Sequence, residues 1–143
     1  VIEESVLAGA GDRYLARLGD ALVRLAAARE THSVVSCAVH RVRTAGGKKR
    51  MDVLADETNL SMRQLERVFC EHVGLSPKTY SRLVRFDGAA RGVPARGTLS
   101  WTHFALTHGY GDQAHFINDF KEFSGVTPAQ FEAELAGGEL RSH

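Results

Sequence analysis

One stretch of the chain carries polar side chains, at the spacing of a helix face, that could hold the edges of nucleic-acid bases. Over residues 62–73, apolar side chains recur every three or four positions and predict an amphipathic helix. At about 100° per residue, Arg63 and Arg67 point away from the apolar side, with Glu66 beside them. An arginine can hold guanine through two hydrogen bonds. The pattern favours base contact, and a solvated helix face is the alternative.

A second stretch offers different chemistry on the same kind of face. On a helix over 113–123, Ala114 and Asn118 lie opposite the apolar stripe. Gln113 and His115 sit at the edges, near the helix N-terminus. Asn and Gln can hold adenine through two hydrogen bonds, and Ala can contact the methyl group of thymine. For His115, packing at the edge of the helix is an equal alternative to base contact.

Both stretches belong to a pattern that the chain repeats. The spacing between matching positions is 50 residues before a turn and 51 after it, because Gly109-Tyr110-Gly111-Asp112 contains one extra residue. A repeated hydrophobic skeleton with one insertion in a turn indicates two copies of one small unit. The matching positions are Leu54 and Phe104, Ala55 and Ala105, Leu65 and Phe116, Phe69 and Phe120, Gly74 and Gly125, Ser76 and Thr127, Pro77 and Pro128, and Tyr80 and Phe131.

Each copy has the signals of a short helix, a tight turn and a longer capped helix. The first short helix is predicted over 51–58, with Val53, Leu54 and Ala55 facing inward, and the second follows Ser100. Ser61 and Asp112 are predicted N-caps of the two longer helices, whose free N–H groups could face a phosphate. This is the pattern of a helix-turn-helix, although an αα-hairpin or a helical repeat without DNA binding has similar signals.

The rest of the chain is also helical in pattern. Helices are predicted over 12–29 and 34–42, over the segment from Pro77 to about Arg91, and from Ala129 to about Leu135. No segment alternates with period two, so the predicted fold class is all-α. The predicted organisation is a connector helix within 1–32, a first helix-turn-helix subdomain over 33–76, a connecting helix and loop over 77–97, a second subdomain over 98–136, and a frayed C-terminus over 137–143.

Charge is distributed unevenly between the two copies. The formal net charge of the 143 residues is only +1. Residues 59–97 contain seven basic and three acidic side chains, a local +4, whereas residues 98–143 contain two basic and six acidic side chains, a local −4. A basic surface, if present, therefore belongs to the first copy. No apolar run approaches the ~18 residues of a membrane span, so no membrane partner is expected.

Other functional classes have little support in the sequence. Cys37 and Cys70 are predicted to be buried or partly buried free thiols, and no CxxC motif suggests a metal site. The histidines do not form a metal-binding pattern with carboxylates, and no nucleophile elbow or phosphate loop occurs. We therefore expect no enzyme, no catalytic or metal-binding residues and no cofactor.

The repeated unit resembles the DNA-binding domain of the arabinose-regulator (AraC/XylS-type) family, from about Val34 to Leu135. The resemblance implies a bacterial transcription regulator with two helix-turn-helix subdomains joined by a long connecting helix, and with double-stranded DNA as its partner. The residues that carry it are Leu54 to Ser61, Leu65 to Phe69, Gly74 to Pro77, Tyr80 and Arg85 in the first half, and Ala105, Gly109-Tyr110, Asp112 to Phe116, Phe120-Lys121, Gly125 and Thr127-Pro128 in the second.

The resemblance also assigns roles to individual residues. Its base-reading positions fall on Arg63, Glu66 and Arg67 in the first copy, and on Gln113, Ala114, His115 and Asn118 in the second. Contacts to the DNA backbone fall on Ser61, Lys121, Arg82 and Arg85. The two recognition helices are expected in successive major-groove segments, about one DNA turn or ~34 Å apart.

The chain departs from the family in places. The family often has a basic residue where this chain has Asn118, and Gly88 and Gly92 interrupt a segment that is usually more helical. A small-molecule effector would bind a domain that this chain does not contain, and the helix over 12–29 is either a remnant of an upstream sensor or dimerisation domain or an extra helix packed on the first unit. RNA polymerase is a possible partner, so a protein–protein module with weak or no independent DNA binding is the alternative function. The expected location is cytoplasmic, associated with the nucleoid.

Overall fold

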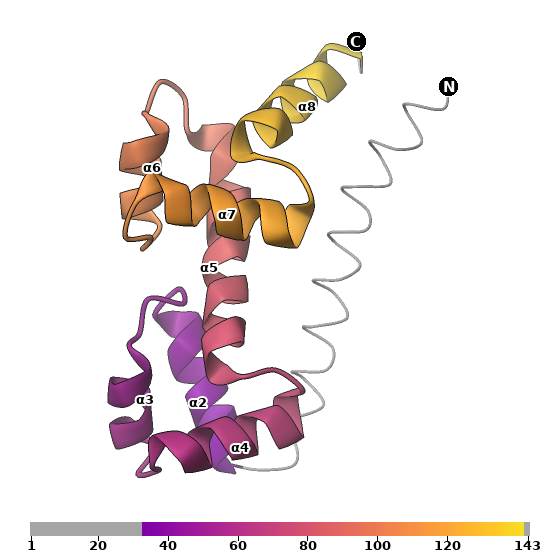
Figure 1. The fold of residues 1–143 in the computed structure, drawn as a ribbon. Helices are drawn as coiled ribbons and strands as arrows, with labels where there is room; N and C mark the ends of the chain where they lie inside the picture. Colours follow the sequence, from indigo (N-terminus) through magenta and orange to yellow (C-terminus); the bar gives the residue numbers. More distant parts are fainter. Residues whose placement is uncertain (1–32, 142–143) are drawn as a thin grey trace. The chain divides into compact units, whose positions relative to one another are not determined.

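The computed structural model describes residues 33–141, and all of its regular elements are helical (Figure 1). This confirms the all-α prediction for the described residues. The helix predicted over 12–29 lies outside them. The elements are α2 (Ser33–Thr44), α3 (Met51–Glu57), α4 (Met62–Val73), α5 (Pro77–Gly92), the short 3-10 helix η1 (Val93–Ala95), α6 (Trp101–Thr107), α7 (Gln113–Ser124) and α8 (Pro128–Arg141).

The described residues form two compact units, 33–85 and 86–141, which we call the first and second subdomains. The boundary falls inside α5, so the predicted connecting helix is shared between the two units. The first subdomain contains α2, α3 and α4, and the second contains α6, α7 and α8. Each unit therefore holds one complete helix-turn-helix.

An aliphatic core holds the first subdomain together. Its buried residues come from α2, α3, α4 and the first part of α5, and the ring of Tyr80 on α5 packs against Phe69 on α4 with 5.5 Å between ring centroids. The core residues are Val35, Ala38, Val39, Val42, Leu54, Ala55, Leu65, Phe69, Val73 and Tyr80. Burial of such side chains stabilises a fold by roughly 1.5–3 kcal/mol each before entropy is counted. This core fixes α4 against α2 and α3.

Gly47, in the loop after α2, lies so close to the backbone of α5 that no side chain fits there. A Cβ atom at this position would lie 2.2 Å from the Ser81 carbonyl oxygen, and the Gly47 φ of +72° is also unfavourable for other residues. The Arg85 guanidinium donates a 2.8 Å hydrogen bond to the Gly47 carbonyl oxygen. The loop after α2 is therefore joined directly to α5.

The second subdomain has an aromatic core. Phe116 on α7 is fully buried, and its ring contacts the rings of Trp101, Phe104, Tyr110 and Phe120 at centroid distances of 5.2 to 6.0 Å. These rings replace the aliphatic side chains of the first copy, so α7 is held mainly by aromatic contacts.

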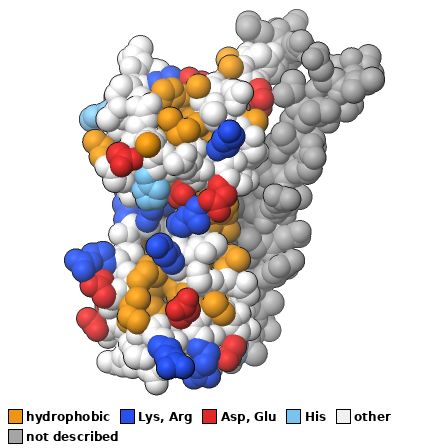
Figure 2. All heavy atoms as spheres, viewed as in Figure 1, with side chains coloured by type: hydrophobic (Ala, Val, Ile, Leu, Met, Phe, Trp, Pro, Cys, Tyr) orange, Lys and Arg blue, Asp and Glu red, His pale blue; other side chains and the backbone are white. Residues whose placement is uncertain are grey.

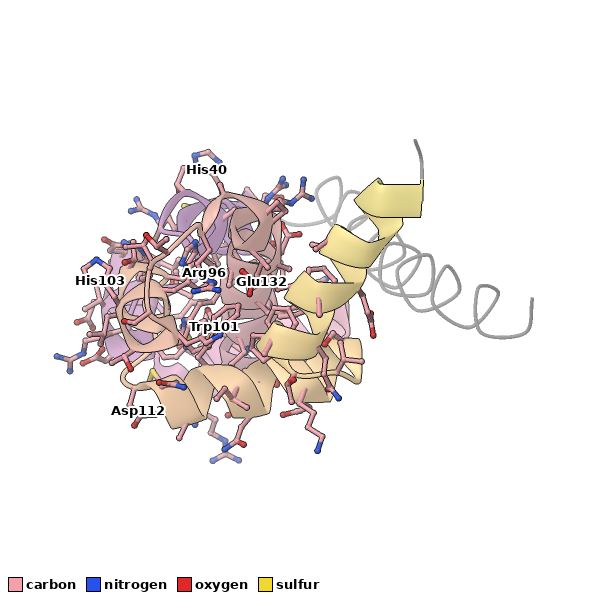
Figure 3. The ribbon with its side chains drawn as sticks, turned by 90° about the horizontal axis from the view of Figure 1, so that it is seen from above. His40, Arg96, Trp101, His103, Asp112 and Glu132 are labelled. Carbon is pink, nitrogen blue, oxygen red and sulfur yellow. The ribbon has the colours of Figure 1, made fainter. Side chains whose placement is uncertain are left out.

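Arg96 reinforces that core from the loop before α6. It donates hydrogen bonds of 2.9 and 2.7 Å to the two carboxylate oxygens of Glu132 on α8, and its guanidinium lies 4.0 Å from the centre of the Trp101 ring. Figure 3 shows Arg96 turned toward both residues. Only 14% of the Arg96 side chain is exposed. This cluster joins the loop, α6 and α8.

Two helices run further than the sequence predicts. The last helix passes through Gly137-Gly138 to Arg141, so its end near Leu135 and the frayed segment 137–143 were wrong for residues up to 141. Helix α5 likewise continues through Gly88 to Gly92. Glycine lowers helix stability by about 1 kcal/mol without forbidding helical geometry. At Gly92 a Cβ atom would lie 2.7 Å from His108 Nε2, so contact with His108 requires glycine there.

Three predictions of burial were wrong. Cys37 and Cys70 are free thiols, as expected, but both side chains are exposed. Val53, predicted to face inward on α3, is 41% exposed. Helical periodicity marks the apolar side of each helix, but the edge of the buried strip depends on which neighbours cover it.

Candidate DNA-binding surface

The turn of the first helix-turn-helix is closed by side-chain and backbone hydrogen bonds. The buried Thr58 hydroxyl donates 2.8 Å to the Leu54 carbonyl oxygen, and the Leu60 N–H donates 3.0 Å to the Ala55 carbonyl oxygen. Asn59 between them takes a positive φ of 56°, which Asn tolerates better than most residues. The turn therefore sets the direction in which α4 starts.

Ser61 caps the start of α4, as the sequence predicts. Its hydroxyl oxygen accepts from the Gln64 N–H at 3.1 Å, and the Gln64 side chain accepts from the Ser61 N–H at 2.9 Å. This capping box contributes about 1 kcal/mol to the helix. At the other end Gly74 takes the left-handed conformation, with φ of 80°. Helix α4 is thus defined at both ends by local interactions.

The outward face of α4 presents the three predicted base-reading residues of the first copy. Arg63, Glu66 and Arg67 are all exposed. Among the described residues, Arg63 and Glu66 make no hydrogen bond or ion pair with their side chains. Arg67 lies 3.6 Å from Glu71 in an exposed pair one helical turn apart. An exposed pair of this kind is worth at most about 1 kcal/mol, so Arg67 can exchange it for another partner.

The second turn has the same backbone arrangement with other side chains. The Tyr110 N–H donates 3.0 Å to the Ala105 carbonyl oxygen, and a ring nitrogen of His108 lies 2.9 Å from the Phe104 carbonyl oxygen. Gly109 supplies the positive φ, at 84°. After the extra residue, Gly111, the Asp112 carboxylate accepts from the His115 N–H at 2.7 Å and caps α7. The predicted cap is confirmed.

The outward face of α7 is less charged than that of α4. Ala114 and Asn118 are exposed, and the Asn118 side chain makes no hydrogen bond within the described part of the chain. Gln113 is half-buried, and its side-chain oxygen accepts a 2.7 Å hydrogen bond from the Thr102 hydroxyl on α6. That contact orients the amide of Gln113 at the start of the helix.

His115 turns back toward its own subdomain. Its ring packs edge-on against Tyr110 at 5.4 Å, and its Nε2 lies 3.8 Å from the buried Asp119 carboxylate. Nearly half of the His115 side chain is still exposed. His115 therefore packs at the edge of α7, and the part of its ring that faces outward (its exposed rim) is accessible.

The predicted backbone-contacting residues fall into two groups. Ser61 and Lys121 are exposed at the start of α4 and on α7. Arg82 and Arg85 are half-buried on α5, and Arg85 is engaged with Gly47. Met62, which the sequence reasoning did not single out, is 51% exposed in the first turn of α4. Because Met62 directly follows the cap Ser61, its position in the first turn of α4 could have been predicted from the sequence.

The charges near the first helix-turn-helix are partly paired. Lys49 donates to both carboxylate oxygens of Glu57, at 2.9 and 2.8 Å, and Arg41 lies 3.1 Å from the same group. The hydrogen bond from Lys49 is the main cause that lowers the pKa of Glu57 below its usual value. On the face shown in Figure 2, basic side chains lie beside acidic ones. The surface is therefore mixed in charge, which makes individual exposed arginines more important than bulk charge.

A family model described as a helix-turn-helix domain matches residues 54–134, more than half of the chain. Two curated relatives are similar over this region. The regulator ArgR of Pseudomonas aeruginosa is 30% identical over 87 residues, 61% of this chain and 26% of its own length. The activator RhaS of Escherichia fergusonii is 33% identical over 79 residues, 55% of this chain and 28% of its own length. The chain spans about a quarter of the length of these relatives.

Solved structures have the same fold. The C-terminal domain of the response regulator AraT from Geobacillus stearothermophilus superposes with a TM-score of 0.67 at 23% identity, covering 73% of this chain and 87% of that domain. An AraC-type regulator from Chromobacterium violaceum gives a TM-score of 0.62 at 24% identity, covering 71% and 90%. The chain belongs to the AraC-type helix-turn-helix family and carries the DNA-binding region of a transcription regulator.

Within residues 33–141, no helix is long and apolar enough to cross a membrane. No group of three or more potential metal ligands occurs in the same part of the chain.

Proposed function

We propose that this chain binds double-stranded DNA sequence-specifically by placing α4 and α7 in successive major-groove segments. The observation that carries the proposal is the outward face of α4. There Arg63 and Glu66 are exposed and have no partner among the described residues, at the start of a helix held rigidly by its cap and core. Unpaired polar side chains on a helix that its cap and core hold in place suit the recognition of base edges.

Base reading is assigned to the exposed positions of both helices. Arg63 and Arg67 suit guanine, Glu66 suits the amino group of cytosine, and Asn118 suits adenine. Gln113 and Ala114 lie in the first turn of α7, where a recognition helix commonly reaches bases. His115 would contact DNA through its exposed rim. The exposed Ser61 and Lys121 would bind phosphates, and Arg82 and Arg85 would contribute from α5.

Selection of bound duplexes from random DNA tests the proposal directly. On the selected site, Arg63→Ala and Arg67→Ala should each weaken binding by about 1–3 kcal/mol and relax preference at one base pair. Lys121→Ala should weaken all sequences alike and reduce the salt slope by about 1. If neither arginine variant changes affinity or preference, the α4 face does not dock on DNA.

Arg43→Ala is the matched control. Arg43 is an exposed arginine on α2, outside the helix-turn-helix, so its removal changes net charge by the same amount. We expect a small, sequence-independent loss of affinity with unchanged base preference. A loss of specificity equal to that of Arg63→Ala would show that overall charge, and not the α4 face, selects the site.

The whole regulator is proposed to have further partners. RhaS is described as a transcriptional activator, and a structure similar in fold is that of a xylose-binding transcription activator of which this chain covers 27%. By analogy with these activators, we propose that the whole regulator has a separate effector-binding domain, contacts RNA polymerase and acts at the nucleoid in the cytoplasm. Transcription measured on the selected site, with exposed residues such as Leu106 substituted, should separate a polymerase contact from DNA binding.

A further inference from the structure

The two recognition helices present different chemistry, and we infer that they read DNA segments of different composition. On this inference α4 binds a segment rich in G·C pairs, and α7 binds a segment in which A·T pairs carry the specificity. The inference rests on the proposed function, since it requires both helices to contact bases.

The face of α4 contains the groups that recognise G·C pairs. Arg63 and Arg67 lie one helical turn apart and are exposed, and each guanidinium matches the O6 and N7 acceptors of guanine. Glu66 between them has an exposed carboxylate that can accept from the cytosine amino group. A carboxylate repels phosphates and guanine acceptors, so its presence restricts the bases that fit under this helix.

The face of α7 has no cation or carboxylate at the equivalent positions. Where α4 has Arg63 and Arg67, α7 has Ala114 and Asn118, 51 residues later in both cases. Both are exposed, and the Asn118 amide is unpaired among the described residues. An amide pairs with the N6 and N7 atoms of adenine, and an Ala methyl packs on the thymine methyl.

Gln113 and Ile117 strengthen this assignment. The Gln113 oxygen already accepts from Thr102 at 2.7 Å, which fixes the amide while its NH2 group and a second lone pair stay available for adenine. Ile117 stands where α4 has Glu66, is half-buried, and adds apolar surface beside Ala114. The first turns of α7 therefore combine amide and apolar groups.

Base analogues on the selected duplex test each contact separately. Replacing guanine by 7-deazaguanine in the α4 segment removes the N7 acceptor and should weaken binding by about 5- to 100-fold per guanine held by two hydrogen bonds. Replacing thymine by uracil in the α7 segment removes the methyl group and should weaken binding by about fourfold. The Ala114→Gly variant should be insensitive to uracil, whereas Ala133→Gly, an exposed helical position on α8, should respond like the parent chain.

A graft of one face onto the other tests the inference as a whole. The full chain with Ala114→Arg and Asn118→Arg should select a G·C-rich segment under α7 while its α4 segment stays unchanged. An equal charge increase through Ala133→Arg and Ala136→Arg should leave both segments as they were.

The outcomes distinguish a failure of this inference from a failure of the proposed function. Failure to enrich any duplex would reject the proposed function. Enrichment of a site whose two segments have the same composition, or whose α7 segment is indifferent to uracil and to the graft, would leave DNA binding intact and overturn the inference.

Discussion

The two helix-turn-helix subdomains build the same turn from different side chains. At the end of the first short helix, a Thr58 hydroxyl binds the Leu54 carbonyl oxygen, and in the second copy a His108 ring nitrogen approaches the Phe104 carbonyl oxygen. A capping box at Ser61 corresponds to a single carboxylate cap at Asp112. The backbone geometry of the turn is therefore the shared requirement, and several side chains can meet it.

The same comparison shows how the interactions that stabilise the two copies differ. The first core is mainly aliphatic and the second mainly aromatic, and each subdomain has a partly exposed ion pair that joins two segments, Lys49 with Glu57 in the first and Arg96 with Glu132 in the second. Equivalent positions should thus respond differently to substitution.

Loss of the central ring should have the largest effect. Phe116→Ala removes a fully buried side chain with four aromatic neighbours, and we expect it to lower the free energy of unfolding of the second subdomain by about 3–5 kcal/mol. Urea denaturation followed by the fluorescence of Trp101, the single tryptophan, reports on this unit. A cost below 1 kcal/mol would mean that the aromatic core can collapse around the gap.

Gly47 and Gly97 occupy matching positions of the repeat, one before each short helix. Even so, replacing each with alanine should lower stability by very different amounts. Gly47→Ala places a methyl against the Ser81 carbonyl oxygen at 2.2 Å and should cost about 3 kcal/mol or more. Gly97→Ala meets no atom within 4 Å and should cost only the strain of a positive φ, about 1 kcal/mol. Equal losses in chemical denaturation would show that φ alone decides both positions.

Breaking the ion pair of the second subdomain should cost an intermediate amount. Arg96→Met keeps the apolar stem over Trp101 but leaves Glu132 without its two hydrogen bonds. We expect a loss of about 2 kcal/mol, below the range for a fully buried pair because a third of Glu132 is exposed. Adding Glu132→Gln removes the unpaired charge and should recover part of the lost stability. If no stability is recovered, the loss comes from the contact between Arg96 and Trp101.

The ion pair of the first subdomain, Lys49 with Glu57, should give a smaller, pH-dependent effect. The folded pKa of Glu57 is lowered, chiefly by Lys49, so its ionised form stabilises the fold above the unfolded pKa of ~4.3. This stabilisation is lost as the pH falls through the folded pKa. Glu57→Gln should therefore be less stable than the parent chain at pH 7 and equal to it under strongly acidic conditions. A difference that persists there would contradict an electrostatic origin.

The smallest effect is expected for Tyr80→Phe, because the second copy already has a phenylalanine at the matching position. Tyr80 corresponds to Phe131, and its buried hydroxyl has no hydrogen-bond partner within the described part of the chain. Tyr80→Phe should change stability near pH 7 by less than about 1 kcal/mol, in either direction. Burial raises the pKa of Tyr80 to about 12, so the parent chain should lose stability as the pH rises from ~10 to 12. Chemical denaturation across this pH range should find the loss absent in Tyr80→Phe.

The sequence by itself determined the features that depend on short stretches of chain. The caps Ser61 and Asp112 and the all-α class of the described residues follow from interactions three or four residues apart, and they are confirmed. The repeat also predicted which helix faces would be apolar. The base-reading roles of Arg63 and Asn118 stay predictions, because they depend on a partner molecule.

Only the tertiary structure decided which distant groups meet. Contacts such as Gly47 with Ser81, or Arg96 with Glu132, join residues more than 30 positions apart, and no local pattern encodes them. The exposure of Cys37 and Cys70 depends on the neighbours that cover each helix edge, which periodicity does not specify. A helix fixes its own side-chain directions, whereas packing fixes which of those directions are free to reach another molecule.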